Sequence, residues 1–389
     1  TSQSTSVKTT GSYTDIRLED FQSPPQGTQK VSIITNLDSR STDKSTNEDN
    51  PFFAMYSSWD SNNETPLDDT RYAYQTTLKV YDENGSSHDL TVYFDKVQDD
   101  LSDTGGNSYW EYMVTVNPLE DNRTIWEGLS DAASEKRGVL MMGSLSFNSI
   151  GDLTNMSAFT IRDIDGSTDA VDLSDAGDPG ALNNWKPAQF NNEGLPIFTA
   201  NFQGISDADA TNATSNNIAL DFGMRAKNLD DTFDSYPHMN GWEAGSLNDD
   251  QYFNATDVGS LGSNPQLSHQ YLPEFHDAER QALSVTSYSS ASTTYTQSQD
   301  GYPPGDLQNI SVSRDGVVTG HYSNGQVLQH YALTLANFNN TQGLRQEGGN
   351  LFSKTRDSGD ATTGLPGTTG LGTIASKSLE QSNVDMSEE

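Results

Sequence analysis

The sequence contains no cysteine. That absence excludes disulfide bonds, thiol catalysis and cysteine-ligated metal sites, and it is compatible with export of the chain in an unfolded state. Only 32% of the residues are hydrophobic. No stretch approaches the roughly 18 consecutive apolar residues that would predict a transmembrane helix. No secretory signal peptide is visible either.

Basic residues are also scarce. Lys and Arg together number 21 against 55 Asp and Glu, which gives a formal net charge of −34. A field of that sign opposes binding to nucleic acid and to an anionic membrane, so we expect neither as a partner. We interpret the acidic surface as a solvated one that resists aggregation.

The composition instead favours short strands joined by many turns. Gly, Ser, Thr, Asn and Asp are abundant, whereas 9% aromatic residues are too many for a disordered chain. A chain of 389 residues is long enough for about two or three domains. We therefore predict a mainly β, multi-domain protein of antiparallel β sandwiches or barrels, with nested insertions and very little helix.

Two dipeptides predict a three-stranded meander near the C-terminus. Asp315-Gly316 and Asn324-Gly325 separate three apolar runs, which are Gln308–Val312, Val317–Tyr322 and Gln326–Phe338. Such dipeptides favour two-residue hairpin turns, because Gly and Asn tolerate the positive φ that the turn requires. The three runs are therefore expected to pair as antiparallel neighbours.

A second hairpin is predicted further towards the N-terminus. Thr77–Asp82 and His88–Lys96 flank a turn at Glu83–Ser86, and apolar residues alternate in both runs. Alternation of this kind indicates strands with one buried face. A Trp-containing strand is expected to follow at Tyr109–Val114.

The remaining segments are less regular. Val31–Leu37 reads as a strand, residues 38–70 as a long surface loop anchored by Phe52–Tyr56, and Pro273–Leu283 as a short helix. Several aromatic residues fall in loop-like stretches, where we expect them to cap local cores rather than to mark protein contacts. They are Tyr56, Trp59, Trp126, Trp185 and Trp242.

The acidic residues do not form a recognisable metal motif. Asp163 and Asp165 begin like a calcium loop, but the pattern needs Gly where Thr168 stands and Glu where Ser174 stands. We interpret this stretch as a solvated loop.

The histidines lack zinc spacing as well, although His321 and His330 fall on neighbouring predicted strands. Hydrolase and nucleotide-binding motifs are absent. We therefore predict no catalytic, cofactor-binding or metal-binding residue, no cofactor, and no enzymatic activity.

A series of short motifs in the last ninety residues resembles the bacterial flagellar rod–hook family, and its hook proteins in particular. The hairpin at residues 77–96 and Asn36-Leu37-Asp38-Ser39 resemble the same family, in the order that the family requires. The motif residues of the C-terminal series are Asp306, Leu307, Tyr322, Asn324, Gly325, Ala336, Asn337, Phe338, Gly343, Leu344, Leu379, Glu380, Ser382, Asn383, Val384 and Asp385.

This resemblance implies a structural subunit of the flagellar hook, the curved helical tube that acts as universal joint between motor and filament. It implies a homopolymer as the main partner, with the hook cap, the hook–filament junction proteins and the distal rod as further partners. It also implies an extracellular location on the flagellum, after export by the flagellar type III system. The alternatives are another rod or hook-associated protein, or a secreted β-sandwich adhesin or carbohydrate-binding module.

The resemblance also implies a nested domain order. We expect a split inner β domain at 1–30 and 303–389, and an outer β domain at 31–165 and 216–302. Residues 166–215 and 226–285 are expected to be elaborations or a third inserted domain. Because the sequence opens with Thr1 and stops after Leu379–Asp385, we expect a fragment that lacks the family's terminal coiled-coil helices. Such a fragment is not expected to polymerise by the native route.

Overall fold

The structure, a computed structural model, describes eleven segments of the chain. They are residues 22–47, 52–97, 106–126, 134–161, 185–203, 216–227, 239–240, 274–275, 277–349, 351–368 and 370–378. The chain divides into two compact units. We call Gln26–Tyr302 the central unit, and we call Thr1–Pro25 with Pro303–Glu389 the C-terminal unit.

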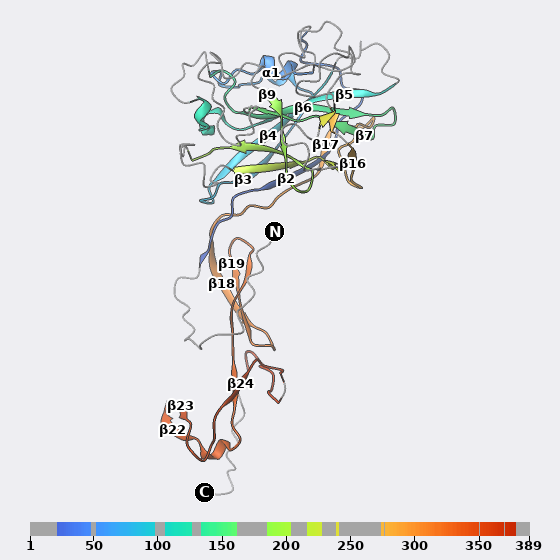
Figure 1. The fold of residues 1–389 in the computed structure, drawn as a ribbon. Helices are drawn as coiled ribbons and strands as arrows, with labels where there is room; N and C mark the ends of the chain where they lie inside the picture. The colour runs from blue at the N-terminus through green and yellow to red at the C-terminus, as the bar shows by residue number, and fades with distance from the viewer. Residues whose placement is uncertain are drawn as a thin grey trace. The chain divides into compact units, whose positions relative to one another are not determined.

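The central unit contains a large antiparallel sheet with the strand order β3-β4-β5-β6-β8-β9, and β7 pairs with β6 beside that path (Figure 1). Its strands are β3 (Tyr74–Tyr81), β4 (Ser87–Lys96), β5 (Ser108–Thr115), β6 (Val139–Phe147), β7 (Leu153–Met156), β8 (Phe159–Ile161) and β9 (Trp185–Pro187). The β3–β4 hairpin and the Trp-containing β5 lie where the sequence predicts them. Leu78 and Val80 are buried on one face of β3, as their alternation indicates.

A smaller sheet in the same unit has the order β10-β11-β12-β2-β17. Its strands are β2 (Lys30–Asn36), β10 (Gln189–Phe190), β11 (Pro196–Ala200), β12 (Asn216–Asp221) and β17 (Thr293–Gln299). All its pairs are antiparallel except β12 with β2, which is parallel. Because those two strands are far apart in the chain, no tight hairpin forces them to run in opposite directions.

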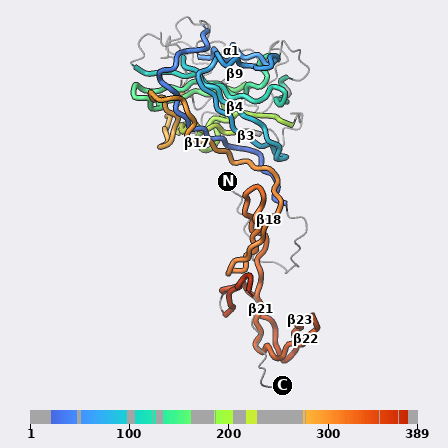
Figure 2. The backbone as a smooth tube through the Cα atoms, turned by 180° about the vertical axis from the view of Figure 1, so that it is seen from behind, coloured from blue at the N-terminus to red at the C-terminus, as the bar shows by residue number. Residues whose placement is uncertain are grey.

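The large sheet is covered on both faces. On one face, Phe94 and Tyr112 contact Phe222, which directly follows β12, with ring centroids 5.7 and 5.1 Å apart. On the other face lie residues 37–47 and 52–73, which we call the covering loop. Figures 1 and 2 show its short helix α1 (Ala54–Ser58) on the opposite side of the large sheet from β17.

The predicted anchor of this loop is confirmed, because Phe52–Tyr56 is buried against the sheet. Phe52 packs on Tyr109, and Trp59 packs on Tyr93. The core-capping interpretation of the loop aromatics is also confirmed for Tyr56, Trp59, Trp126 and Trp185, each at most 5% exposed. Trp242 lies outside the described residues.

The predicted helix at Pro273–Leu283 is wrong for the residues described. Glu274–Phe275 forms β15, which pairs with β14 (Met239–Asn240), and Ala278–Arg280 forms β16, which pairs with β13 (Met224–Ala226). Asp277, between the two strands, has φ +48°, which is incompatible with a right-handed helix. An isolated helix of this length is marginal in water, so cross-strand pairing prevails.

The C-terminal unit contains the predicted meander in a sheet with the order β1-β18-β19-β20. Its strands are β1 (Gln22–Ser23), β18 (Gly305–Val312), β19 (Val317–Tyr322) and β20 (Val327–Ala332). Both turns place glycine at positive φ, +79° at Gly316 and +81° at Gly325. The predicted two-residue turns are wrong, however, because Asp315 and Asn324 do not have positive φ. Each turn contains three residues instead, closed by the Ser313 amide donating to the Val317 carbonyl and by the Tyr322 amide donating to the Gln326 carbonyl.

The predicted third run is too long, because it divides between two sheets. β20 ends at Ala332, and β21 (Leu335–Asn337) pairs with β24 (Thr362–Gly364) instead. No Gly or Pro marks this change of partner, so the apolar pattern alone does not show it. A further hairpin consists of β22 (Arg345–Gly348) and β23 (Leu351–Ser353).

Besides α1, the helical elements in the described segments are short 3₁₀ turns. They are Asp69–Arg71, Pro118–Glu120, Thr124–Trp126 and Thr341–Gly343. None of the helices in these segments has the length and apolarity needed to cross a membrane.

Candidate functional site

The first group of motif residues surrounds the start of β18. The Asn324 side-chain amide donates to the Pro303 carbonyl at 2.9 Å and to the Ser23 hydroxyl at 3.3 Å, and its oxygen accepts from the Gln326 amide at 3.1 Å. Gly305 leaves the space for it, since a Cβ there would lie 2.5 Å from the Asn324 Cγ. One turn residue thereby fixes β1, the entry to β18 and its own hairpin.

The neighbouring motif residues fasten the same strands. Asp306 accepts from the Gln22 side chain at 3.1 Å, and Leu307 is the register partner of Tyr322. The Tyr322 hydroxyl lies 2.5 Å from Nε2 of His330 on β20. Burial lowers the pKa of His330 and raises the pKa of Tyr322, so both groups are held in their neutral forms at neutral pH.

His321 and His330 lie on neighbouring strands, and each makes a hydrogen bond of its own. His321 Nε2 lies 3.2 Å from the Ser311 hydroxyl, whereas His330 contacts Tyr322. In the described part of the chain, no group of three or more His, Asp or Glu side chains is placed to hold a metal ion. The Asp163–Asp165 loop lies outside the described residues.

A second group of motif residues lies further along the C-terminal unit. Ala336 and Asn337 pair with β24, and Phe338, which follows β21, is half-buried. Gly343 passes close to the backbone of Asp357, where a Cβ would meet the Asp357 carbonyl carbon at 2.8 Å. The next residue, Leu344, ends the 3₁₀ turn there. The motif residues Leu379, Glu380, Ser382, Asn383, Val384 and Asp385 lie outside the described residues.

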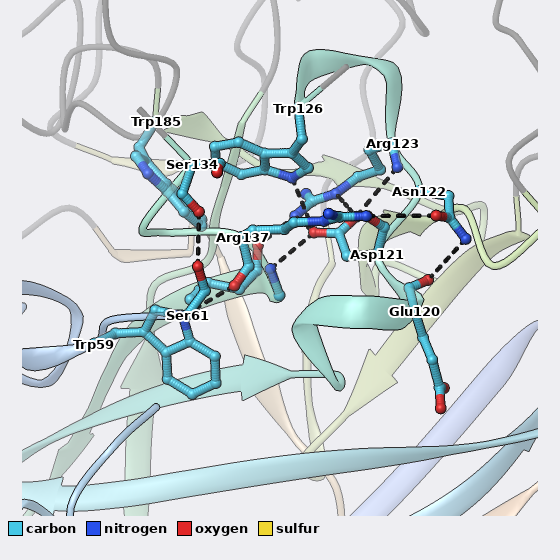
Figure 3. A network of polar contacts seen from close by, with 12 residues as sticks. Trp59, Ser61, Glu120, Asp121, Asn122, Arg123, Trp126, Ser134, Arg137 and Trp185 are labelled. Atoms are coloured by element: carbon cyan, nitrogen blue, oxygen red, sulfur yellow. Dashed lines mark hydrogen bonds and ion pairs between the residues drawn. The ribbon is translucent and has the colours of Figure 1, made fainter. Parts of the chain in front are cut away.

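A buried polar network in the central unit, which the sequence does not signal, is centred on Asp121 (Figure 3). Arg123 donates to both Asp121 carboxylate oxygens, at 2.8 and 2.6 Å. The Trp126 indole and the Gly138 amide donate to the same carboxylate at 2.9 Å each. Burial opposes ionisation of Asp121, but the Arg123 charge and these hydrogen bonds outweigh it and lower its pKa.

Arg137 extends this network to the covering loop. Its guanidinium donates to the Asp121 carbonyl at 2.7 Å, and its own carbonyl accepts from the Trp59 indole at 3.0 Å. Ser61 reaches the same segment through the Ser134 carbonyl at 2.8 Å (Figure 3). The network thus fastens one loop to another. An Asp-x-Arg sequence in a polar stretch gives no signal of burial, which is why sequence reasoning missed it.

A groove of the central unit, of about 820 Å³, is polar and lined by several charged side chains. Lys30 contacts Glu193 at 2.9 Å and Asp221 at 3.4 Å, and Arg225 contacts Glu279 at 2.6 Å. These contacts pair oppositely charged side chains along its lining. The described residues thus form a multi-sheet β protein in which buried polar groups join loops to strands.

The comparisons with known proteins agree with that class. The family described as Flagellar basal body protein FlaE D2 domain matches residues 36–302. The match covers more than half of the chain, and the chain belongs to this family.

Individual relatives point the same way. The chain is 45% identical over 103 residues to the flagellar hook protein FlgE of Helicobacter pylori strain ATCC 700392 / 26695, covering 26% of this chain and 14% of the relative. It is 44% identical over 99 residues to the Escherichia coli K12 hook protein FlgE, covering 25% of each. The Treponema pallidum hook protein FlgE is 27% identical over 236 residues, covering 59% of this chain and 49% of the relative. The matches thus span between about a seventh and about half of those relatives.

Proposed function

We propose that this chain is part of the structural subunit of the bacterial flagellar hook, which assembles with copies of itself. The observation that carries the proposal is the identity of 44–45% to two hook proteins over about a hundred residues. The family match over residues 36–302 supports it independently. The role is mechanical and requires no catalysis.

The two units support a division of labour within such a polymer. We assign the C-terminal unit to a split inner domain and the central unit to an outer domain inserted in it, because both ends of the central unit connect to the C-terminal unit. Copies joined head to tail without closure form a helical tube. The hook cap, the hook–filament junction proteins and the distal rod are its proposed further partners, and the flagellar type III system its export route.

The absence of cysteine permits a direct test of location in living cells. Ser289 is exposed and Ser287 is buried, only two residues away in the central unit. Cells whose hook gene carries Ser289→Cys, treated with a fluorescent maleimide, should show one short label at the base of each filament. Cells with Ser287→Cys, the matched control, should stay dark there.

A deletion strain tests the function itself. Loss of motility, with basal bodies that carry rods but no hooks, is the expected result, and the intact gene should restore swimming. Truncated rods would favour a rod protein instead. Normal swimming with lost attachment to surfaces or sugars would overturn the proposal and favour an adhesin or carbohydrate-binding module.

A further inference from the structure

Two buried carboxyl groups lie side by side beneath the covering loop. Asp95 on β4 and Glu111 on β5 are cross-strand register partners, so their side chains share one face of the large sheet. Asp95 is fully buried and Glu111 is 3% exposed. Two acids this close and this far from water cannot both ionise without a large electrostatic cost.

Each carboxyl holds a different part of the covering loop. Asp95 Oδ2 accepts from the backbone amides of Lys44 at 2.9 Å and Ser45 at 2.7 Å. Both Glu111 oxygens lie 3.1 Å from the Met55 amide at the start of α1. The two halves of the described loop are therefore seated on one pair of acids.

The charged side chains named below do not offset the negative charge that Asp95 and Glu111 would carry when ionised. Asp43, from the loop, acts on both carboxyls and is itself an acid. Lys96 follows Asp95 on β4, so its side chain leaves from the opposite face of the strand, and its ammonium donates to the Ser39 carbonyl, at the start of the covering loop, at 3.1 Å. From β6, the register partner of Glu111 is the uncharged Ser144. Beyond it on that face, Glu274 accepts from the Ser146 hydroxyl at 2.7 Å.

Asp95 Oδ1 is buried and accepts no hydrogen bond from the described residues. An unsatisfied buried oxygen of this kind is less costly on a neutral carboxyl than on a carboxylate. Burial and the Asp43 charge raise the pKa of Asp95 to about 6, against the backbone amides of Lys44, Ser45 and Lys96, which lower it. Burial and the charge of Asp95 raise the pKa of Glu111 well above its usual range.

We propose that Asp95 and Glu111 form a proton-dependent clasp that keeps the covering loop seated while the pair retains a proton and loosens it when the pair ionises. The folded pKa values are raised, so the stabilisation is complete below the unfolded values near 4. It is lost as pH rises through about 6 for Asp95, and as pH rises through the raised folded value for Glu111. The clasp is therefore closed in acid and loosens as the pH rises.

Amide hydrogen exchange of the whole chain between pH 4.5 and 8 tests the clasp, after correction for the intrinsic pH dependence of exchange. Protection of the Lys44, Ser45 and Met55 amides should fall by at least about tenfold, the factor that one pKa unit carries. The Gly138 amide, held by the ionised Asp121, is an internal control and should keep its protection. Return to pH 4.5 should restore the loop.

The double variant Asp95→Asn/Glu111→Gln should remove the pH dependence, whereas Glu64→Gln, an exposed position of the same loop, should leave it intact. Should the double variant fail to fold, Asp43→Asn serves instead, and the loosening should become smaller and shift to lower pH. Unchanged protection of the three amides across the pH range in the native chain would overturn the clasp. Equal loss at Gly138 would also overturn it, because the effect would then be global.

Discussion

Different interactions stabilise the two units. The central unit buries a continuous apolar cluster between its sheets and beneath the covering loop, including Phe94 and Trp110 at 0% exposure. Among the described residues of the C-terminal unit, the buried hydrophobic side chains are Val318 and Tyr322. That unit depends instead on strand pairing, close glycine contacts and the Asn324 hydrogen bonds.

Their charges differ as much as their cores. The central unit, residues 26–302, contains 43 acidic and 14 basic side chains of the 55 and 21 in the chain. The C-terminal unit, residues 1–25 and 303–389, contains the other 12 acidic and 7 basic ones. A large core tolerates self-repulsion that a thin unit would not, and repulsion between acidic surfaces limits association until specific contacts outweigh it. The charge of the C-terminal unit therefore opposes association less than that of the central unit does.

The largest expected effect comes from the core of the central unit. Phe94→Ala should lower its free energy of unfolding by about 3–5 kcal/mol, because it removes a fully buried ring and leaves a cavity. All five tryptophans lie in residues 26–302, so urea denaturation followed by Trp fluorescence measures this unit alone. Exchange of the β18–β20 amides should not change. A parallel loss there would show that the units unfold together.

The sequence predicts the strands that pair with segments nearby in the chain better than the strands that pair with distant segments. The β3–β4 hairpin and the β18–β20 meander are local, and their turns and alternation are visible in the residues themselves. The parallel pairing of β2 with β12 is not visible in the sequence, since it joins segments nearly two hundred residues apart. Nor is the strand at Ala278–Arg280, whose pairing with Met224–Ala226 overrides a helical pattern.

The same distinction applies to the candidate sites. The resemblance selects Asn324 and Tyr322 as motif residues, and the structure gives them hydrogen-bond partners on neighbouring strands. Asp121 and Glu111 look like ordinary acids in an acidic chain. Only the packing of distant loops onto the sheet makes them buried, and a single sequence contains no mark of that packing.

A smaller part of the central unit's stability should depend on charge pairing. Asp121→Asn leaves the Arg123 guanidinium with little access to water, and loss of one partner of a buried ion pair typically costs about 3 kcal/mol or more. We expect about 3 kcal/mol, because Arg123 keeps its hydrogen bond to the Val139 carbonyl at 2.7 Å. Trp fluorescence in urea measures the loss.

The pH dependence of that loss separates it from the clasp. The folded pKa of Asp121 is lowered, so its contribution is present above the unfolded value near 4 and disappears as pH falls through the folded value. The destabilisation by Asp121→Asn should therefore shrink in acid. A constant difference between native and variant chains down to pH 2 would argue that packing, and not charge, explains the effect.

The smallest effect should arise in the C-terminal unit and stay there. Gly305→Ala places a methyl group 2.5 Å from the Asn324 Cγ, so the Asn324 side chain must shift and weaken its bonds to Ser23 and Pro303. Overpacking of this kind costs about 1–3 kcal/mol. The change should appear as faster exchange of the β18 and β19 amides, with Trp fluorescence unaltered. Gly372→Ala, where a Cβ meets no atom within 4 Å, is the matched control and should match the native chain. If the two alanine variants behaved alike, the close approach of Gly305 to Asn324 would not be what holds this unit together, and its stability would have to come from the strand pairing alone.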